Sequence, residues 1–252
     1  MGKYFNKVVK PIIDGSVQNT QFANNDLLFD WTAFQIPKGG ACIKGVTAIV
    51  RGEDGAATTN PQALHLYFAR QVDHSAPDSL GTINASANGK FNYNALIGAM
   101  KLSKDDSKID GLDYVMVFDS QGAGDDAASA RHPHLVLASE DSQAVSGFET
   151  FYVACVHHGG NGLNFSTGVL LDQVGNQGTA TVETTLTTDG THAGKAFAIG
   201  DVIIDAANAT IGTVTAIGGN TSITVDAVAN ALTDDDELLV QSPVSLIFHC
   251  ER

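Results

Sequence analysis

The sequence predicts an all-β protein, in which a jelly-roll-like β-sandwich carries a small β-barrel domain inserted near the C-terminus. Three observations predict this fold class. Short runs of apolar and β-branched residues recur along the chain, many with the period of two that half-buried strands require. Turns rich in Gly, Pro, Asn and Asp separate these runs. Helix signals are few, because only residues 94–102 could form two helical turns.

The strands of the main domain begin at residue 27. Leu27, Phe29 and Trp31 lie on one face of the first run by period two. The run 148–158 has apolar side chains on both faces, which is typical of a strand in the centre of a sheet. The expected strands of this domain are 27–36, 41–51, 64–70, 114–120, 148–158 and 245–251.

Residues 178–240 differ from the rest of the chain in composition. They contain nine acidic residues and a single base, Lys195, so their net charge is −8, and −6 remains for the other 189 residues. Short apolar runs within this stretch predict a small β-barrel. Because the β pattern of the main domain resumes at 243–252, we expect the small domain to be inserted into a loop of the larger one.

The first 26 residues show little periodicity, and we expect them to form an arm or a frayed terminus. The sequence therefore divides into three parts. They are an N-terminal arm (1–26), a main β-sandwich (27–177, completed by 241–252) and an inserted acidic small β-barrel domain (178–240).

The arm carries the chain's only basic block. Three lysines place a charge of +3 in ten residues that contain no acid, although the whole chain has a net charge of −14. Such a segment suits an acidic partner surface, with apolar side chains adding contact area. The predicted partner-binding residues are Lys3, Tyr4, Phe5, Lys7, Val8, Val9 and Lys10.

Charge and cysteine usage exclude several classes of function. With 28 acidic against 14 basic residues, the surface repels phosphate backbones and anionic lipid, so we expect no direct binding to nucleic acid or membrane. We find no secretory signal and no apolar run long enough for a transmembrane helix. Cys42, Cys155 and Cys250 are odd in number and widely spaced, which favours buried thiols in a reducing compartment over disulfides.

No motif specifies an enzyme, and we predict neither catalytic residues nor a cofactor. The segment 190–195 is one residue short of a phosphate-binding loop, and Ala196 stands where that loop needs Ser or Thr. No serine-hydrolase elbow is present. The acidic pairs and the run Asp234–Glu237 match no calcium loop, so we interpret them as solvated loops.

One cluster has the residue types of a metal site. Cys155 and His157 share a strand face, which suits two ligands of one ion, and His158, His132 and His134 could add to them. The matching pair elsewhere, His249 and Cys250, would lie on opposite faces of an extended strand. We therefore predict a buried thiol and core histidines, without a metal.

Two segments carry a resemblance to a known group of proteins. Residues 27–55, LLFDWTAFQIPKGGACIKGVTAIVRGEDG, resemble the first two strands of structural proteins from virions of marine tailed bacteriophages, cyanophage-like ones in particular. Residues 196–240 resemble a small β module that many such proteins carry. The resemblance implies a capsid decoration, or cement, protein that docks on the major capsid protein as a homotrimer. It also implies synthesis in the host cytoplasm and a final place on the capsid surface.

Two other interpretations stay open at this stage. The chain could be a tail, neck or fibre-associated virion component, although neither a repeat nor a coiled-coil heptad is visible. It could also be a carbohydrate-binding or adhesin-like β module, which would need an exposed aromatic platform. The single tryptophan, Trp31, lies in an apolar alternation and is expected in the core.

Overall fold

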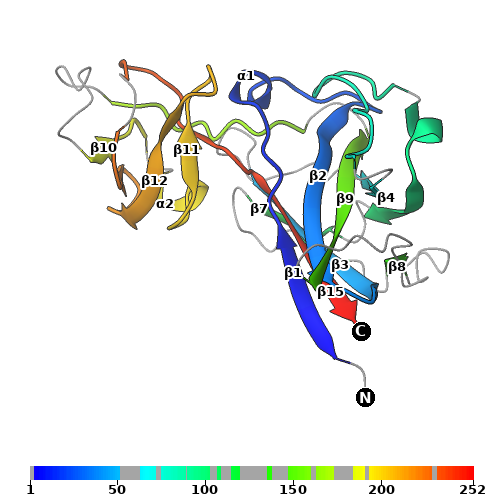
Figure 1. Ribbon diagram of the computed structural model, residues 1–252. Helices are drawn as coiled ribbons and strands as arrows, with labels where there is room; N and C mark the ends of the chain where they lie inside the picture. Colours follow the sequence, from blue (N-terminus) through cyan, green and yellow to red (C-terminus); the bar gives the residue numbers. More distant parts are fainter. Residues whose placement is uncertain are drawn as a thin grey trace.

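The fold is built almost entirely from antiparallel strands, which confirms the all-β prediction (Figure 1). Its helical segments, α1 (Gly15–Gln18), η1 (Lys90–Tyr93) and α2 (Ala193–Ala196), are four residues long. The computed structural model describes residues 3–51, 63–71, 75–88, 90–102, 107–108, 115–119, 135–137, 147–159, 163–172, 184–190, 193–228 and 232–252.

The first sheet joins the two ends of the described chain. Its strand order is β1-β15-β3-β7-β6, and β8 pairs with β3 beside this path. All its pairings are antiparallel. The strands are β1 (Tyr4–Val9), β3 (Ala41–Arg51), β6 (Ser107–Lys108), β7 (Val115–Asp119), β8 (Leu135–Leu137) and β15 (Val244–Glu251).

The second sheet has the order β2-β9-β4-β5, again antiparallel throughout. The predicted central strand is confirmed, because β9 is hydrogen-bonded on both sides. Its strands are β2 (Leu27–Pro37), β4 (Ala63–Arg70), β5 (Leu96–Leu102) and β9 (Phe148–His158).

The two sheets share one hydrophobic core. Phe34 and Phe68 of the second sheet both contact Phe248 of the first, with ring centroids 5.0 and 5.5 Å apart. Burial alternates along β15, so Leu246 and Phe248 point inward while Ile247 points out. The period of two that marked these runs in the sequence therefore fixes which face of each sheet is buried.

Two local expectations are wrong. The possible helix at 94–102 is strand β5 instead, because its apolar residues can pair with β4 at the edge of the second sheet. The simple alternation of Leu27, Phe29 and Trp31 also fails, since β2 shifts register twice in this stretch. As a result Phe29 enters the main core, while Leu27 and Trp31 pack in a second cluster on the other face of the sheet.

A third sheet has its own hydrophobic core, distinct from the main one. Its order is β10-β13-β12-β11-β14, and Gly219, with φ of +85°, forms the tight turn between β12 and β13. Val169 and Leu171 join this core from outside the predicted range 178–240. The strands are β10 (Thr185–Thr187), β11 (Val202–Ile204), β12 (Thr210–Ile217), β13 (Ser222–Val225) and β14 (Leu239–Val240).

The segment around α1 lies at the junction between the two-sheet body and the small sheet (Figure 1). The Ile13 amide donates to the Gln241 carbonyl at 3.0 Å, and Gln18 Nε2 donates to the Val240 carbonyl at 3.1 Å. Gly15 approaches the small body so closely that a Cβ atom there would lie 2.3 Å from the Asp205 carbonyl oxygen. The described part of the predicted arm, from residue 3 onward, is therefore incorporated in the fold.

Candidate functional site

Strand β1 holds the predicted partner-binding residues at one edge of the first sheet (Figure 1). It pairs with β15 from Tyr4 opposite Glu251 to Val9 opposite Leu246. Among the described residues, no strand pairs with its other side. The site is therefore an open sheet edge, a feature that proteins often use to add a strand from another segment.

The side chains of β1 divide between the two faces of the sheet. Val9 is buried in the main core and Phe5 packs against that core, so these two stabilise the fold. Tyr4 and Val8 point the other way and are 76% and 52% exposed. Lys7 is half-buried on the side of Phe5 and Val9.

The backbone of β1 follows the same alternation. Lys3 and Arg252 exchange both of their backbone hydrogen bonds, at 3.0 and 2.9 Å. In an antiparallel pair such bonded positions recur at every second residue, so Phe5, Lys7 and Val9 direct their N–H and C=O groups toward β15. The backbone groups of the intervening residues, Tyr4, Asn6 and Val8, point away from the sheet.

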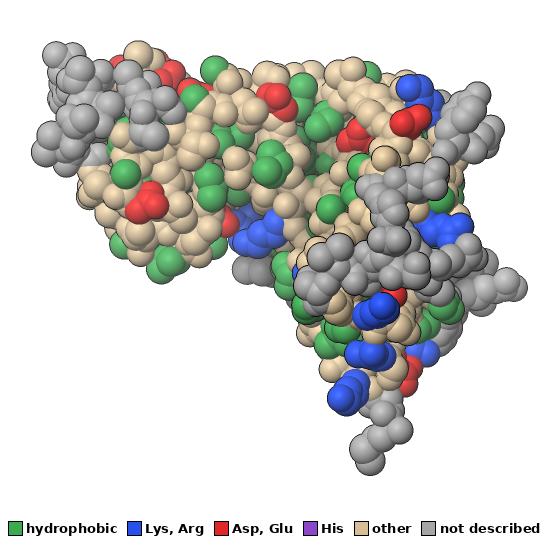
Figure 2. All heavy atoms as spheres, viewed as in Figure 1, with side chains coloured by type: hydrophobic (Ala, Val, Ile, Leu, Met, Phe, Trp, Pro, Cys, Tyr) green, Lys and Arg blue, Asp and Glu red, His purple; other side chains and the backbone are tan. Residues whose placement is uncertain are grey.

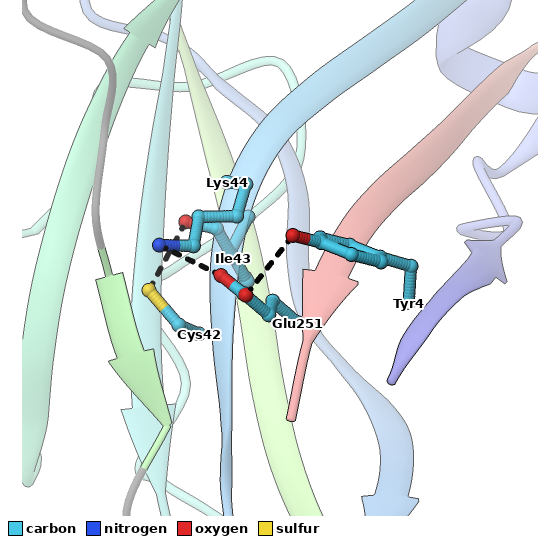
Figure 3. A network of polar contacts seen from close by, with 5 residues as sticks. All are labelled: Tyr4, Cys42, Ile43, Lys44 and Glu251. Carbon is cyan, nitrogen blue, oxygen red and sulfur yellow. Dashed lines mark hydrogen bonds and ion pairs between the residues drawn. The ribbon is translucent and has the colours of Figure 1, made fainter. Parts of the chain in front are cut away.

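A polar network ties β1 to the two strands beside it (Figure 3). The Tyr4 hydroxyl donates to Glu251 Oε1 at 3.1 Å, and Lys44 Nζ pairs with Glu251 Oε2 at 3.0 Å. The hydrogen bond with the Glu251 carboxylate raises the pKa of Tyr4, and the pKa of Lys44 is raised for the same reason. Cys42, the residue opposite Glu251, directs its thiol to the Ile43 carbonyl.

A second cross-strand network lies two residues along the same face. His249 Nδ1 contacts Asn6 Oδ1 at 3.1 Å, and His249 Nε2 contacts Thr47 Oγ1 at 3.0 Å. Since an amide oxygen only accepts, the contact with Asn6 places a proton on Nδ1. These contacts link β1, β15 and β3, so the open edge is held by side chains as well as by its ladder.

The lysines of the N-terminal segment give this edge a positive charge. Lys3 and Lys10 are exposed at the two ends of β1, and Lys7 lies between them. Figure 2 shows Lys and Arg side chains gathered at the end of the molecule where β1 and β15 lie. A cationic strip of this kind, on a chain of net charge −14, favours an acidic partner.

The predicted thiol and histidine cluster lies in and beside the main core. Cys155 and His157 are buried, and His157 Nδ1 contacts the Ala23 carbonyl at 2.9 Å. On the other face of the sheet, His158 stacks on His65 with ring centroids 4.5 Å apart. Burial raises the pKa of Cys155 and lowers those of His65 and His157.

The geometry of this cluster gives no metal centre in the part of the chain that the structure describes, where no three His, Cys, Asp or Glu side chains converge. His132 and His134 lie outside the described residues. As the alternation predicted, His249 and Cys250 face opposite ways, because Cys250 is buried in the core. None of the described helices has the length and apolar character needed to cross a membrane.

The acidic run before β14 contributes to the fold, although its sequence suggested only a solvated loop. Glu237 Oε1 accepts hydrogen bonds from the Ser166 hydroxyl at 2.5 Å and the Thr167 amide at 3.1 Å. Its other oxygen accepts from Asn19 Nδ2 at 2.7 Å. Glu237 therefore bonds to two distant segments, and no local signal could have revealed this.

Trp31 lies outside the main core, in which its apolar alternation predicted it. Its ring is half-buried against the cluster on the outer face of the second sheet, and its Nε1 donates to the Asp78 carbonyl at 2.9 Å. This packing leaves Trp31 less exposed than a carbohydrate-binding platform requires, although Tyr67 packs against the same cluster. Comparison of the chain with family models, curated proteins and solved structures finds no match.

Proposed function

We propose that this chain is a structural virion protein that decorates, or cements, the capsid of a tailed bacteriophage. In this proposal it docks non-covalently on the major capsid protein, assembles with copies of itself as a homotrimer and carries out no catalysis. The observation that carries the proposal is the open, cationic edge strand β1 on a two-sheet body. Such an edge supplies an adhesive surface and needs no reactive group.

The proposal includes a jelly-roll fold for the main body, supported by the order of pairing. Apart from the short strands β6 and β8, which extend the first sheet, eight strands form two layers in the orders β1-β15-β3-β7 and β2-β9-β4-β5. Counted along the chain as one to eight, the first pairs with the last, the second with the seventh, the third with the sixth and the fourth with the fifth. This nesting is the pattern of a jelly roll, a fold used by viral capsid and lectin domains.

The proposal also includes a second domain, in which the third sheet forms a small β-barrel inserted into a loop of the main body. All five of its strands lie between β9 and β15, the seventh and eighth strands of the nested set. Its separate core supports an independent unit. Its surplus of acidic residues would keep the outward side of the assembled particle from adhering to DNA or to anionic envelopes.

Fold alone does not assign function, because jelly rolls also occur in lectins. Within the described residues, the aromatic side chain that a lectin would offer, Trp31, is packed and hydrogen-bonded. The charged edge, in contrast, has an evident use in assembly. The proposal therefore favours a virion component, made in the host cytoplasm, over a lectin.

Counting copies in purified particles tests the proposal. Quantitative mass spectrometry of intact virions, referenced to the major capsid protein, gives the number of chains in each particle. A decoration protein is expected in hundreds of copies, because the capsid repeats its docking site by symmetry. A count of about six to eighteen would assign the chain to the tail or neck instead, and absence from particles would refute the proposal.

A further inference from the structure

We propose that β1 binds an extended acidic segment of another polypeptide, which adds as a strand to the open edge of the first sheet. The inference rests on the proposed role of this strand in partner binding. It adds the mode of binding and the chemistry of the bound segment.

The backbone of β1 supplies the first argument. Tyr4, Asn6 and Val8 direct their N–H and C=O groups away from β15, and no described strand pairs with them. An added strand would satisfy these groups with the hydrogen bonds of an ordinary ladder. Because the groups lie at every second residue, the incoming segment must be extended.

The rigidity of β1 supplies the second argument. Its outer face is fixed by the contact of Tyr4 with Glu251 and of Asn6 with His249, and its inner face by Val9 in the core. The edge is therefore already in the conformation that the ladder needs. Binding loses less conformational entropy at such a preformed edge than at a disordered tail.

The charges on β1 select the occupant. A second copy of the chain, pairing β1 with β1, would bring two sets of Lys3, Lys7 and Lys10 together along one edge, with a total charge of +6 and no acid between them. Like charges that face each other across strands are destabilising, whereas opposite charges stabilise the pair. A segment with acidic residues is therefore favoured over self-association.

The two faces of β1 define the pattern of that segment. On one face Lys7 lies in register with Phe5 and Val9, so the added strand should present carboxylates there. On the other face Tyr4 and Val8 are exposed, so it should present apolar or β-branched side chains. The preferred ligand is an extended segment in which acidic residues alternate with Val or Thr.

The test uses the full chain and a fluorescent eight-residue peptide in which Glu alternates with Val and Thr. Two control peptides accompany it. One has Lys in place of Glu, and the other carries an N-methyl group on every amide, so that neither of its edges can donate to a ladder while its charge is kept. Fluorescence anisotropy gives the affinities, and hydrogen exchange followed by NMR reports which amides become protected.

A triple variant provides the matching change in the protein. Lys3→Glu/Lys7→Glu/Lys10→Glu reverses the charge of the edge, and thermal unfolding checks that the variant folds. A second triple variant, Lys90→Glu/Lys101→Glu/Lys195→Glu, makes the same change in net charge at exposed lysines outside the first sheet.

The proposal expects the Glu peptide to bind the unmodified chain and the second variant alike, and to bind the β1 variant at least tenfold more weakly. It expects the methylated and Lys peptides to fail, and new exchange protection at Tyr4, Asn6 and Val8. Equal binding of the methylated peptide, protection at another site, or no binding of the Glu peptide would overturn strand addition. So would dimerisation of the chain through β1.

These outcomes separate the two proposals. If the chain binds the Glu peptide at β1 but is absent from virions, the decoration role is refuted and strand addition is supported. If the chain is present in hundreds of copies but binds the methylated peptide as tightly as the Glu peptide, the decoration role is supported and strand addition is refuted.

Discussion

Arg51, the last residue of β3, forms an ion pair with Asp201, the residue before β11 in the small sheet. Asp201 is 7% exposed, and the same carboxylate oxygen accepts from the Ala198 amide at 2.7 Å. The pair therefore crosses from the two-sheet body to the small one. Together with the hydrogen bonds of the α1 segment, it fixes their junction.

This pair predicts energetic coupling between the two bodies. Arg51→Ala leaves a buried carboxylate with one remaining donor, so we expect a loss of about 2–4 kcal/mol in the free energy of unfolding. Asp201→Asn removes the charge and should make the loss of Arg51 less costly. A double-mutant cycle in urea measures this coupling, and strictly additive effects would show that the ion pair does not join the bodies.

Loss of the Glu237 carboxylate should also lower the stability of the chain at this junction. Glu237→Ala leaves the donors of Asn19, Ser166 and Thr167 without their acceptor, which should lower the free energy of unfolding by about 1–3 kcal/mol. Glu237→Gln keeps one carbonyl oxygen and should cost less. Urea unfolding of the three proteins provides the measurement, and an alanine variant as stable as the original would show that these contacts contribute little.

The histidines of the second sheet predict that the free energy of unfolding depends on pH. Burial lowers the pKa of His65, with His158 and Lys101 adding to the effect, and burial also lowers the pKa of His157. Below the unfolded pKa of about 6.5, the unfolded chain binds more protons than the folded one, so stability falls as the pH falls. We expect a lower free energy of unfolding at pH 5.5 than at pH 7.5.

A variant that lacks both rings provides the comparison. His65→Gln/His157→Gln should lose part of this pH dependence, whatever its stability at pH 7.5. Between pH 7.5 and 8.5 these histidines are neutral in both states, so that interval serves as the control. A variant that keeps the full pH dependence of the original chain would contradict the assignment.

The three thiols should differ in reactivity. Burial raises the pKa of Cys250 to about 11 and also raises that of the fully buried Cys155, whereas Cys42 is half-buried on the outer face of the first sheet. With a thiol reagent at pH 8, we expect Cys42 to react roughly tenfold or more faster than the others, because the thiolate is the reactive form. Cys42→Ser should remove the fast phase, and equal rates for all three thiols in the folded chain would contradict this order.

Much of the β structure could be predicted because its signal is local. The runs 41–51 and 148–158 coincide with β3 and β9, since alternation and β-branched residues mark a strand without reference to its partners. Strand β1 was missed because Lys7 interrupts the apolar alternation of Phe5 and Val9. Charged residues of this kind are common on edge strands, where the sequence pattern is weakest.

The parts that could not be predicted depend on contacts between distant residues. The lysines of the candidate site were found from composition alone, but their place on an edge strand follows from pairing with β15, more than 230 residues away. The role of Glu237 likewise depends on donors about 70 residues earlier in the chain. Sequence periodicity identifies a buried face and leaves open which strands meet.

Binding to emptied capsids tests most directly whether the β1 edge is the adhesive surface. The purified chain is sedimented with capsids stripped of it, alongside the Lys3→Glu/Lys7→Glu/Lys10→Glu variant and the charge-matched variant at Lys90, Lys101 and Lys195. Our account predicts that the β1 variant binds roughly tenfold or more weakly, because three ion pairs of modest strength become repulsions. It predicts unchanged occupancy for the charge-matched variant. Equal occupancy of the original chain and the β1 variant would contradict it.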